Sequence, residues 1–345
     1  MIIRSRAPLR VGLAGGGTDL TPYCDIYGGA VLNATINMFA YCSIETTNGE
    51  KINFESKDLN ATTTINKNEI LGSGEINSVL KLHLGVYRRI RDIYGEMPSA
   101  FNMYTYNEAP IGSGLGGSST MVVAILKAYT EWLNLPLGEY DIANLAWEIE
   151  RKDLALEGGK QDQYAATFGG FNFIEFGSNG KVIVNPLRIK NWIRNEIEDS
   201  LVLFYTGESR ESANIINQQI KSVESDNVRL QSLHELKKIA YSMKEAILVG
   251  DFQKFGNALE QGWLAKKITS DSISNGMLEE IYKTATDAGA AGGKISGAGG
   301  GGFFMFYVDP IKKIDVIKAL GKYNGRVVNM QFTKDGTFGW KIHND

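Results

Sequence analysis

The spacing of hydrophobic residues divides the first half of the chain into strands and helices. Residues 1–60 carry short apolar and β-branched runs, which predict strands separated by turns. Residues 101–106 alternate between apolar and polar side chains and predict a further strand. Another strand is predicted over 171–176, and a Gly-Ser-Asn-Gly turn follows it. Apolar residues at intervals of three and four positions predict helices over about 77–94, 119–134 and 139–156.

Polar helical patterns dominate the chain after about residue 195. Three of them run through 211–225, 229–249 and 252–268. A strand pair around 292–308 and a short helix follow, and the chain closes with strands at 327–333 and 337–343. This order predicts a mixed α+β fold in two lobes, with an N-terminal domain over 1–195 and a C-terminal domain over 196–345.

The composition is that of an ordinary globular protein, with 43% hydrophobic and 22% charged residues among 345. A formal net charge of −3 argues against a protein that coats a nucleic acid, although a few local cations suffice for a small anion. The N-terminus lacks the apolar core of a signal peptide, and no apolar run approaches the roughly 20 residues of a membrane span. We therefore expect a cytoplasmic protein that binds neither nucleic acid nor membrane, with its oligomeric state left open.

The two cysteines, Cys24 and Cys42, form no CxxC motif and have no histidine nearby. They therefore predict buried, inert thiols rather than a disulfide framework or a zinc site.

Glycine gathers in three segments of the chain, at 15–17, 112–117 and 289–302. Glycine adopts positive φ and lets backbone amides approach a ligand closely, but it loses more conformational freedom on folding than other residues. One such cluster is compatible with a simple tight turn. Three clusters in one chain favour a shared functional reason.

The middle cluster leads directly into a predicted helix. Residues 110–119 read Pro-Ile-Gly-Ser-Gly-Leu-Gly-Gly-Ser-Ser. A glycine loop that feeds a helix N-terminus presents unpaired N–H groups and the positive end of the helix dipole, which together suit a phosphate. The hydroxyls of Ser118 and Ser119 suit a phosphate oxygen or a magnesium ion, although serine at a helix start is also an ordinary N-cap.

The same loop satisfies the dinucleotide-binding pattern Gly-x-Gly-x-x-Gly at Gly112, Gly114 and Gly117, with Glu131 about 20 residues further on. That motif requires an apolar strand before the loop and the acidic residue at the end of a second strand. Here the preceding strand is polar and Glu131 lies on the predicted helix itself. The context therefore argues against a NAD-dependent oxidoreductase, and a Walker A loop is absent as well.

The pattern Pro-x3-Gly-Leu-Gly-x-Ser-Ser at 110–119 resembles the phosphate loop of the GHMP kinases, the family of galactokinase, homoserine kinase, mevalonate kinase and phosphomevalonate kinase. Residues 8–19 (Pro-Leu-Arg-Val-Gly-Leu-Ala-Gly-Gly-Gly-Thr-Asp) resemble its N-terminal motif, and residues 294–302 (Lys-Ile-Ser-Gly-Ala-Gly-Gly-Gly-Gly) its C-terminal one. The resemblance implies a two-lobed GHMP kinase fold, with a left-handed β-α-β unit in the N-terminal lobe and a ferredoxin-like C-terminal lobe.

The resemblance also implies ATP as phosphate donor and Mg²⁺ as its counterion. Gly117 departs from the pattern, because many relatives have the first of two serines there, and Ser118 then matches the serine that contacts magnesium. Glu150 matches the magnesium carboxylate, although its interval to the following aspartate differs by about one residue, and Glu148 is its rival on the same helix. The loop residues expected at ATP are Gly112, Ser113, Gly114, Leu115, Gly116, Gly117, Ser118 and Ser119.

Asp162 and Arg10 are the expected catalytic pair. Asp162 matches the family's aspartate that accepts or orients the proton of the acceptor hydroxyl, and the alternative for it is an N-cap of a helix beginning at Gln163. Arg10 matches the arginine of galactokinases, which would hold Asp162 ionised and stabilise charge on the transferring group. Its place between apolar residues of a strand argues against a mere surface charge.

The acceptor is expected beside the first and third motifs. Residues 15–20 (Gly-Gly-Gly-Thr-Asp-Leu) and 158–164 (Gly-Gly-Lys-Gln-Asp-Gln-Tyr) most resemble the heptose 7-phosphate kinases of this family, which phosphorylate an anomeric hydroxyl. An ionised aspartate accepts hydrogen bonds from paired sugar hydroxyls, and the sugar's own phosphate requires cations. The expected substrate contacts are Gly17, Thr18, Asp19, Gly299 and Gly300, with Lys160 and Arg210 as the cations.

The sequence therefore predicts an ATP- and magnesium-dependent kinase for the anomeric hydroxyl of a sugar phosphate. The expected acceptor is D-glycero-D-manno-heptose 7-phosphate and the expected product its 1,7-bisphosphate. Another GHMP sugar kinase, for example one that acts on fucose, and a non-catalytic nucleotide-binding regulator are the alternatives.

Overall fold

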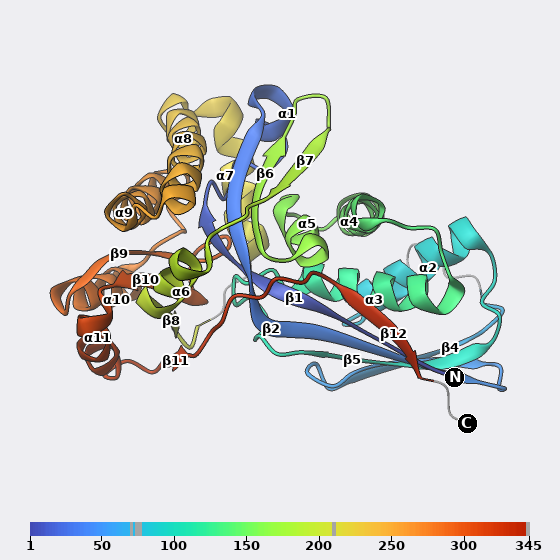
Figure 1. Ribbon diagram of the computed structural model, residues 1–345. Coiled ribbons are helices and arrows are strands. Elements are labelled where there is room, and N and C mark those ends of the chain that lie inside the picture. The colour runs from blue at the N-terminus through green and yellow to red at the C-terminus, as the bar shows by residue number, and fades with distance from the viewer. Residues whose placement is uncertain (70–71, 73–77, 209–211, 343–345) are drawn as a thin grey trace.

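Two β-sheets and the helices packed on them make up the protein (Figure 1). The computed structural model describes residues 1–69, 72, 78–208 and 212–342. The larger sheet has the strand order β12-β1-β2-β5-β3-β4, and β6 and β7 extend it from the first half of β2. Its strands are β1 (Ile2–Ala14), β2 (Gly29–Thr47), β3 (Lys51–Ser56), β4 (Ala61–Asn66), β5 (Ala100–Asn107), β6 (Phe171–Phe176), β7 (Val182–Pro186) and β12 (Phe338–Ile342).

The long strands β1 and β2 take part in two hydrophobic cores. Their outer halves, with Ile3 and Ile44, pack with α2 (Lys81–Tyr94) and α3 (Gly117–Leu133). Their inner halves, with Leu13 and Leu32, pack with α8 (Asn227–Val249) and α9 (Phe252–Ile268). Every β1 residue from 7 to 14 is therefore buried. The middle of β1, which carries Arg10, lies where the two cores meet.

The N-terminal lobe contains the expected β-α-β unit. Strands β3 and β5 pair in parallel, and the chain passes between them through β4 and α2. The helix predicted over 77–94 begins at Lys81, and residue 77 lies outside the described residues. The helix predicted over 139–156 is α4 (Glu139–Glu148) followed by a π-helical turn, Ile149–Asp153.

The smaller sheet belongs to the C-terminal lobe and has the antiparallel order β11-β8-β10-β9. Numbered within the lobe, this is the order 4-1-3-2 of a β-α-β-β-α-β arrangement, the ferredoxin-like lobe that the sequence predicted. The strands are β8 (Leu201–Tyr205), β9 (Ala290–Ile295), β10 (Phe303–Val308) and β11 (Arg326–Val328). The lobe's other helices are α7 (Ser212–Ser225), α10 (Gly276–Asp287), the 3-10 turn Pro310–Lys312 and α11 (Lys313–Leu320).

Several elements differ from the predicted pattern. The sequence pattern missed α6 (Asn191–Ser200), β8 and α10. The strand expected over 327–333 ends at Val328, and only an isolated bridge between Phe332 and Ile36 follows. The last strand, β12, returns to pair with β1 in the first sheet. A division of the chain at 195 and 196 stays a prediction, since the C-terminal residues contribute to both sheets.

Cys24 and Cys42 are free, buried thiols, as predicted. Burial raises the pKa of Cys24 to about 12 and that of Cys42 further, so neither is a thiolate at neutral pH. Within the described ranges, no helix combines the length and the apolar character that a membrane crossing needs.

Candidate active site

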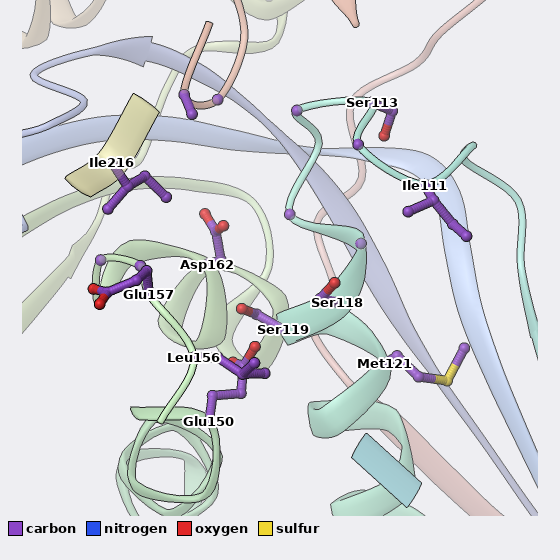
Figure 2. A pocket seen from close by; sticks show the side chains of 18 of the residues that line it. Ile111, Ser113, Ser118, Ser119, Met121, Glu150, Leu156, Glu157, Asp162 and Ile216 are labelled. Atoms are coloured by element: carbon purple, nitrogen blue, oxygen red, sulfur yellow. The ribbon is translucent and has the colours of Figure 1, made fainter. Parts of the chain in front are cut away.

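A cleft of about 480 Å³ brings together segments that are far apart in the sequence (Figure 2). Its walls come from the first glycine motif, the 107–119 loop with the start of α3, and the 156–162 segment. The C-terminal half contributes Ile216, Gln219, Lys266 and Gly297. This volume is typical of a small-molecule site.

The 110–116 loop enters α3 through three glycines in the left-handed region, Gly112, Gly114 and Gly116, with φ of 70°, 79° and 79°. A Cβ on Gly114 would lie 2.2 Å from the carbonyl oxygen of Ser296, and one on Gly116 would lie 3.1 Å from Cγ of Asp162. The loop therefore threads between the third motif and Asp162. Only glycine fits at both places.

The residues predicted to surround ATP mostly line this cleft. Gly112, Ser113, Gly114, Gly116, Gly117, Ser118 and Ser119 do so. Leu115 does not, because its side chain is buried in a hydrophobic core and its carbonyl oxygen accepts the backbone N–H of Arg10 at 3.2 Å. The first N–H groups of α3 have no partner within the helix and lie at the loop's end, which gives the cleft an anion-binding wall.

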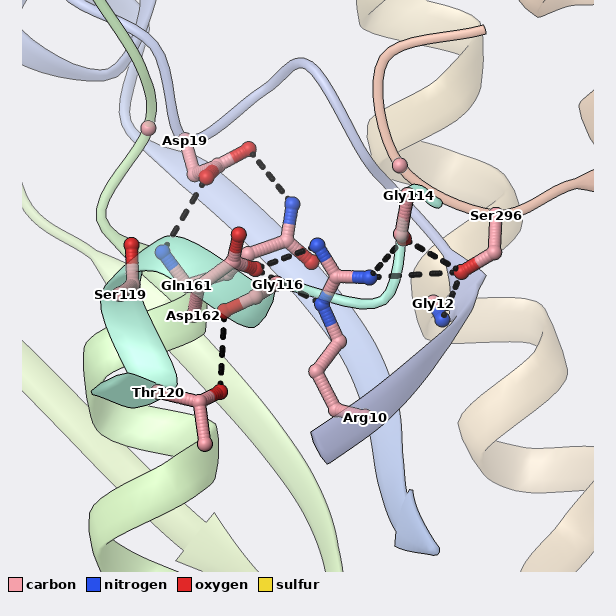
Figure 3. A network of polar contacts seen from close by, with 12 residues as sticks. Arg10, Gly12, Asp19, Gly114, Gly116, Ser119, Thr120, Gln161, Asp162 and Ser296 are labelled. Atoms are coloured by element: carbon pink, nitrogen blue, oxygen red, sulfur yellow. Dashed lines mark hydrogen bonds and ion pairs between the residues drawn. The ribbon is translucent and has the colours of Figure 1, made fainter. Parts of the chain in front are cut away.

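Buried Arg10 and partly buried Asp162 form an ion pair in the cleft (Figure 3). Arg10 Nε donates to Asp162 Oδ1 at 2.7 Å, and Nη2 lies 2.5 Å from the same oxygen. Asp162 stands in the first turn of α5 (Gln161–Phe168) and does not cap it, which removes the N-cap interpretation. Both Arg10 contacts are to one carboxylate oxygen, so Oδ2 is left to face an acceptor.

The third motif holds this pair from the other lobe. Ser296 Oγ accepts the Gly12 N–H at 3.2 Å and lies 3.3 Å from Arg10 Nη1, and it donates to the Gly114 carbonyl at 3.0 Å. Arg10 Nη1 donates to the same carbonyl at 2.6 Å. One hydroxyl thus ties together all three glycine motifs (Figure 3).

Asp19 is buried and fixes the segment that carries Asp162. Its carboxylate accepts the backbone N–H groups of Lys160 and Gln161 at 3.1 and 3.2 Å, the Gln161 side chain at 3.2 Å and the Gly17 N–H at 3.2 Å. Asp19 and Gly17 line the cleft, whereas Thr18 does not. The Thr18 hydroxyl bonds to the Gly15 and Ala30 carbonyls inside the lobe.

Glu150 lies on the π-helical turn and points into the cleft (Figure 2). Burial, the largest cause, raises the pKa of its carboxyl, while Arg151, Gln163 and Ser119 act to lower it. Gln163 Nε2 bridges Glu150 Oε2 at 2.5 Å and Ser119 Oγ at 3.0 Å. Among the described residues, the buried Oε1 of Gln163 has no hydrogen-bond partner. Carboxylate, amide and hydroxyl oxygens are the ligands that Mg²⁺ prefers, so these residues fit the ion.

Other predicted residues lie away from the cleft. Glu148 pairs with Lys152 at 2.8 Å and does not line it, which separates it from Glu150. Lys160 directs its ammonium to Asp25 at 3.1 Å and over the Trp147 ring. Gly299 and Gly300 are not brought to the cleft wall either, where the third motif contributes Gly297 and Ala298. Arg210 falls outside the described residues.

Sequence reasoning missed three polar residues of the site. Ser296 and Lys294 belong to the third motif, but the sequence pattern predicts no role for them or for Lys266. Lys294 is buried and donates to the Gly12 carbonyl at 2.6 Å, and Lys266 is buried and donates to the Gly297 carbonyl. The one sequence signal for the two lysines is that each occupies a position on the apolar face of its helix or strand. Such a lysine is usually interpreted as solvent-exposed.

Comparison with known proteins places these features in context. A model of the GHMP kinases N-terminal domain matches residues 81–170, and one of the GHMP kinases C-terminal domain matches 243–325. The chain is 50% identical over 340 residues to the D-glycero-alpha-D-manno-heptose 7-phosphate kinase of Campylobacter jejuni, with 99% of each chain covered. Its structure matches a D-glycero-D-manno-heptose 1-phosphate kinase from Bacteroides thetaiotaomicron with a TM-score of 0.84 and 47% identity, covering 99% and 100% of the two chains. A putative sugar kinase from Campylobacter jejuni matches with a TM-score of 0.82 and 49% identity, covering 99% and 98%.

Proposed function

Because the chain belongs to the GHMP kinase family and is an ATP-dependent sugar kinase, we propose that it phosphorylates the anomeric hydroxyl of D-glycero-D-manno-heptose 7-phosphate. The product is the 1,7-bisphosphate, and Mg²⁺ accompanies ATP. The observation that carries the proposal is the Arg10–Asp162 ion pair in the cleft, which contacts the glycine loop at the start of α3.

The geometry supports a direct transfer. The acceptor hydroxyl lies beside Asp162, whose Oδ2 takes the hydroxyl proton while Arg10 holds Oδ1 at 2.7 Å. The sugar oxygen forms a bond to the γ-phosphorus, the bond from that phosphorus to the β,γ-bridging oxygen breaks, and ADP leaves with the electron pair. Arg10 and the N–H groups of α3 stabilise the charge on the transferring phosphoryl group.

The remaining parts of the nucleotide have candidate contacts as well. Mg²⁺ neutralises charge on the ATP phosphates when bound, and Ser118 and Glu150 are the residues that would hold it. Apolar side chains line the cleft from three separate segments and offer a flat ring such as adenine a dry surface. They are Leu59, Val79, Leu82, Ile111 and Met121.

The names of two relatives point to two different acceptors. One relative is named for the 7-phosphate and the other for the 1-phosphate. A kinase acting on the 1-phosphate would have to transfer to the far hydroxyl. Offering heptose 7-phosphate, heptose 1-phosphate and fucose separately, with Mg-ATP, therefore distinguishes the acceptors.

The test is phosphate transfer followed by phosphorus NMR, with native protein, Asp162→Asn and a control, Asp287→Asn. Asp287 pairs with Lys283 on α10 and lies outside the cleft. We expect a new anomeric phosphate on heptose 7-phosphate, a loss of about 1,000-fold in kcat for Asp162→Asn, and native rates for the control. Transfer to fucose alone, or to the 1-phosphate alone, would discard the heptose 7-phosphate assignment. Tight ATP binding with no transfer to any acceptor would favour a regulator.

A further inference from the structure

The first glycine motif leaves one corner of the cleft without side chains. Gly17 lines the cleft, whereas Gly15 packs against the Ala30 carbonyl. We call the bare backbone at Gly16 and Gly17 the triglycine recess. A Cβ on Gly16 would lie 3.7 Å from Lys266 Nζ and 3.8 Å from Gln161 Nε2, and one on Gly17 would lie 3.7 Å from Gln219 Nε2. Three nitrogen atoms from α5, α7 and α9 therefore face this stretch of bare backbone.

Lys266 is an unusual lysine because it is buried without a carboxylate partner. It is 3% exposed, lines the cleft and donates to the Gly297 carbonyl. In the part of the chain that the structure describes, no ion pair involves Lys266, whereas its neighbour Lys267 pairs with Glu279 at 3.0 Å. Burying an ammonium without a counter-ion is unfavourable, so this arrangement favours an anionic ligand.

The surrounding charges point the same way. The groups that act on Lys266 are Arg10 and Lys294, which are cations, and Asp19 and Asp162, which are carboxylates. Asp162 is neutralised by Arg10, and Asp19 is occupied by backbone and amide donors. Burial, the largest cause, and then Arg10 lower the pKa of Lys266 to about 8, and a bound dianion would oppose that loss of charge.

We propose that Lys266, at the triglycine recess, binds the phosphate that the sugar already carries. The assignment rests on the proposed function, since it requires a sugar phosphate as acceptor. In-line transfer puts the acceptor hydroxyl beside Asp162, so the sugar's own phosphate needs a cation elsewhere in the cleft wall. The recess supplies one, because Lys266 of α9 and Gln219 of α7 lie against Gly16 and Gly17.

The other cations of the cleft wall are already engaged or badly placed. Within the described residues, the cationic side chains that line the cleft are Arg10, Lys81, Arg151 and Lys266. Arg10 holds Asp162, and Arg151 donates to the Leu156 and Gly159 carbonyls at 3.2 and 3.4 Å. Lys81 starts α2, next to the apolar side chains that suit adenine. Lys266 alone among the four combines burial, a free charge and contact with the recess.

The test compares acceptors with and without the phosphate, using native protein, Lys266→Met, Lys266→Arg and the control Lys267→Met. We expect Lys266→Met to raise KM for heptose 7-phosphate roughly 10- to 100-fold, which is the change in binding that the loss of one hydrogen bond to a charged group usually causes. KM for the unphosphorylated heptose and for ATP stays within twofold, Lys266→Arg recovers part of the loss, and Lys267→Met resembles native protein.

A second measurement needs no variant. The sugar phosphate stays dianionic above pH 7, so its KM rises about tenfold per pH unit once Lys266 loses its proton above about pH 8. KM for the unphosphorylated heptose lacks this rise. Thermal unfolding of each variant shows whether it folds.

The outcomes separate the two claims. If native protein transfers phosphate to heptose 7-phosphate but Lys266→Met leaves its KM unchanged, the inference is overturned and the proposed function stands. The inference is also overturned if kcat falls equally with both acceptors, because Lys266 would then contact the transferred phosphoryl group. If native protein does not use heptose 7-phosphate, the proposed function fails and the inference fails with it.

Discussion

Gly114→Ala tests the contact between the phosphate loop and the third motif. The added Cβ would lie 2.2 Å from the Ser296 carbonyl oxygen, whereas ordinary contact begins at 3.4 Å. The two backbone segments must therefore separate by roughly 1 Å. That oxygen belongs to the residue whose hydroxyl binds Gly12 and the Gly114 carbonyl, so the shift displaces the loop relative to Arg10 as well.

The size of the effect follows from this displacement. A misplacement of about 1 Å at a reacting group costs about 100-fold in rate. We therefore expect kcat to fall about 100-fold, equivalent to about 2.7 kcal/mol of transition-state stabilisation. Gly114 also has φ of 79°, so alanine there loses a further ~1–2 kcal/mol of folding stability for a left-handed conformation.

Gly180→Ala is the matched control. Gly180 has φ of 77° in the turn between β6 and β7, and a Cβ there would meet nothing within 4 Å. It should lose the same ~1–2 kcal/mol in stability and keep native kcat. The assay is ADP release with saturating Mg-ATP and heptose 7-phosphate, alongside urea unfolding of each variant. A Gly114→Ala enzyme with kcat within threefold of native would refute the reasoning, as would a Gly180→Ala enzyme that loses as much activity.

Three further changes have definite expected results. Glu150→Gln should raise the Mg²⁺ concentration for half-maximal activity roughly tenfold or more, because it removes the one carboxylate assigned to the ion. An unchanged Mg²⁺ titration would contradict that assignment. Arg10→Met should lower kcat roughly 100- to 1,000-fold, measured by ADP release, and retained activity would exclude Arg10 from the transfer step. A melting curve should also show a loss of stability, because the change leaves Asp162 without its cation. Trp263→Ala should lower the free energy of unfolding by about 3–5 kcal/mol in urea titrations, since the ring is fully buried against Phe304. A loss below about 1 kcal/mol would contradict that packing.

The parts of the site that are local in sequence could be predicted from it. The 110–119 loop and the helix after it follow from glycine, from turn chemistry and from helical spacing, and the structure places them as one continuous unit. The same holds for the three polar helices of the second half, whose bounds in the structure differ from the predicted ones by at most two residues. Local signals suffice there because propensity, capping and amphipathic pattern agree.

Orientation of long side chains could not be predicted in the same way. Lys160 stands two residues from Asp162, yet its ammonium turns to Asp25 and Trp147, because α1 (Tyr23–Tyr27) and α4 pack beside it. The π-helical turn at Ile149–Asp153 could not be predicted either, because the hydrophobic spacing of an α-helix gives no signal for it. This turn places Glu150 in the cleft wall, while Glu148 stays outside.

The catalytic pair depends on contacts that span nearly the whole chain. Arg10 and Ser296 are 286 residues apart, and Gly12 and Lys294 are 282 apart, yet both pairs are in hydrogen-bond contact. Closing loops of this length costs conformational entropy, and burial in the two cores around β1 and β2 offsets that cost. The glycines of the three motifs are needed for that reason, since backbone of one lobe must touch backbone of the other at Gly114 and Gly297. A cation buried at this junction, such as Lys266, can be recognised only in the assembled fold, because its role depends on the charged groups that the fold places around it.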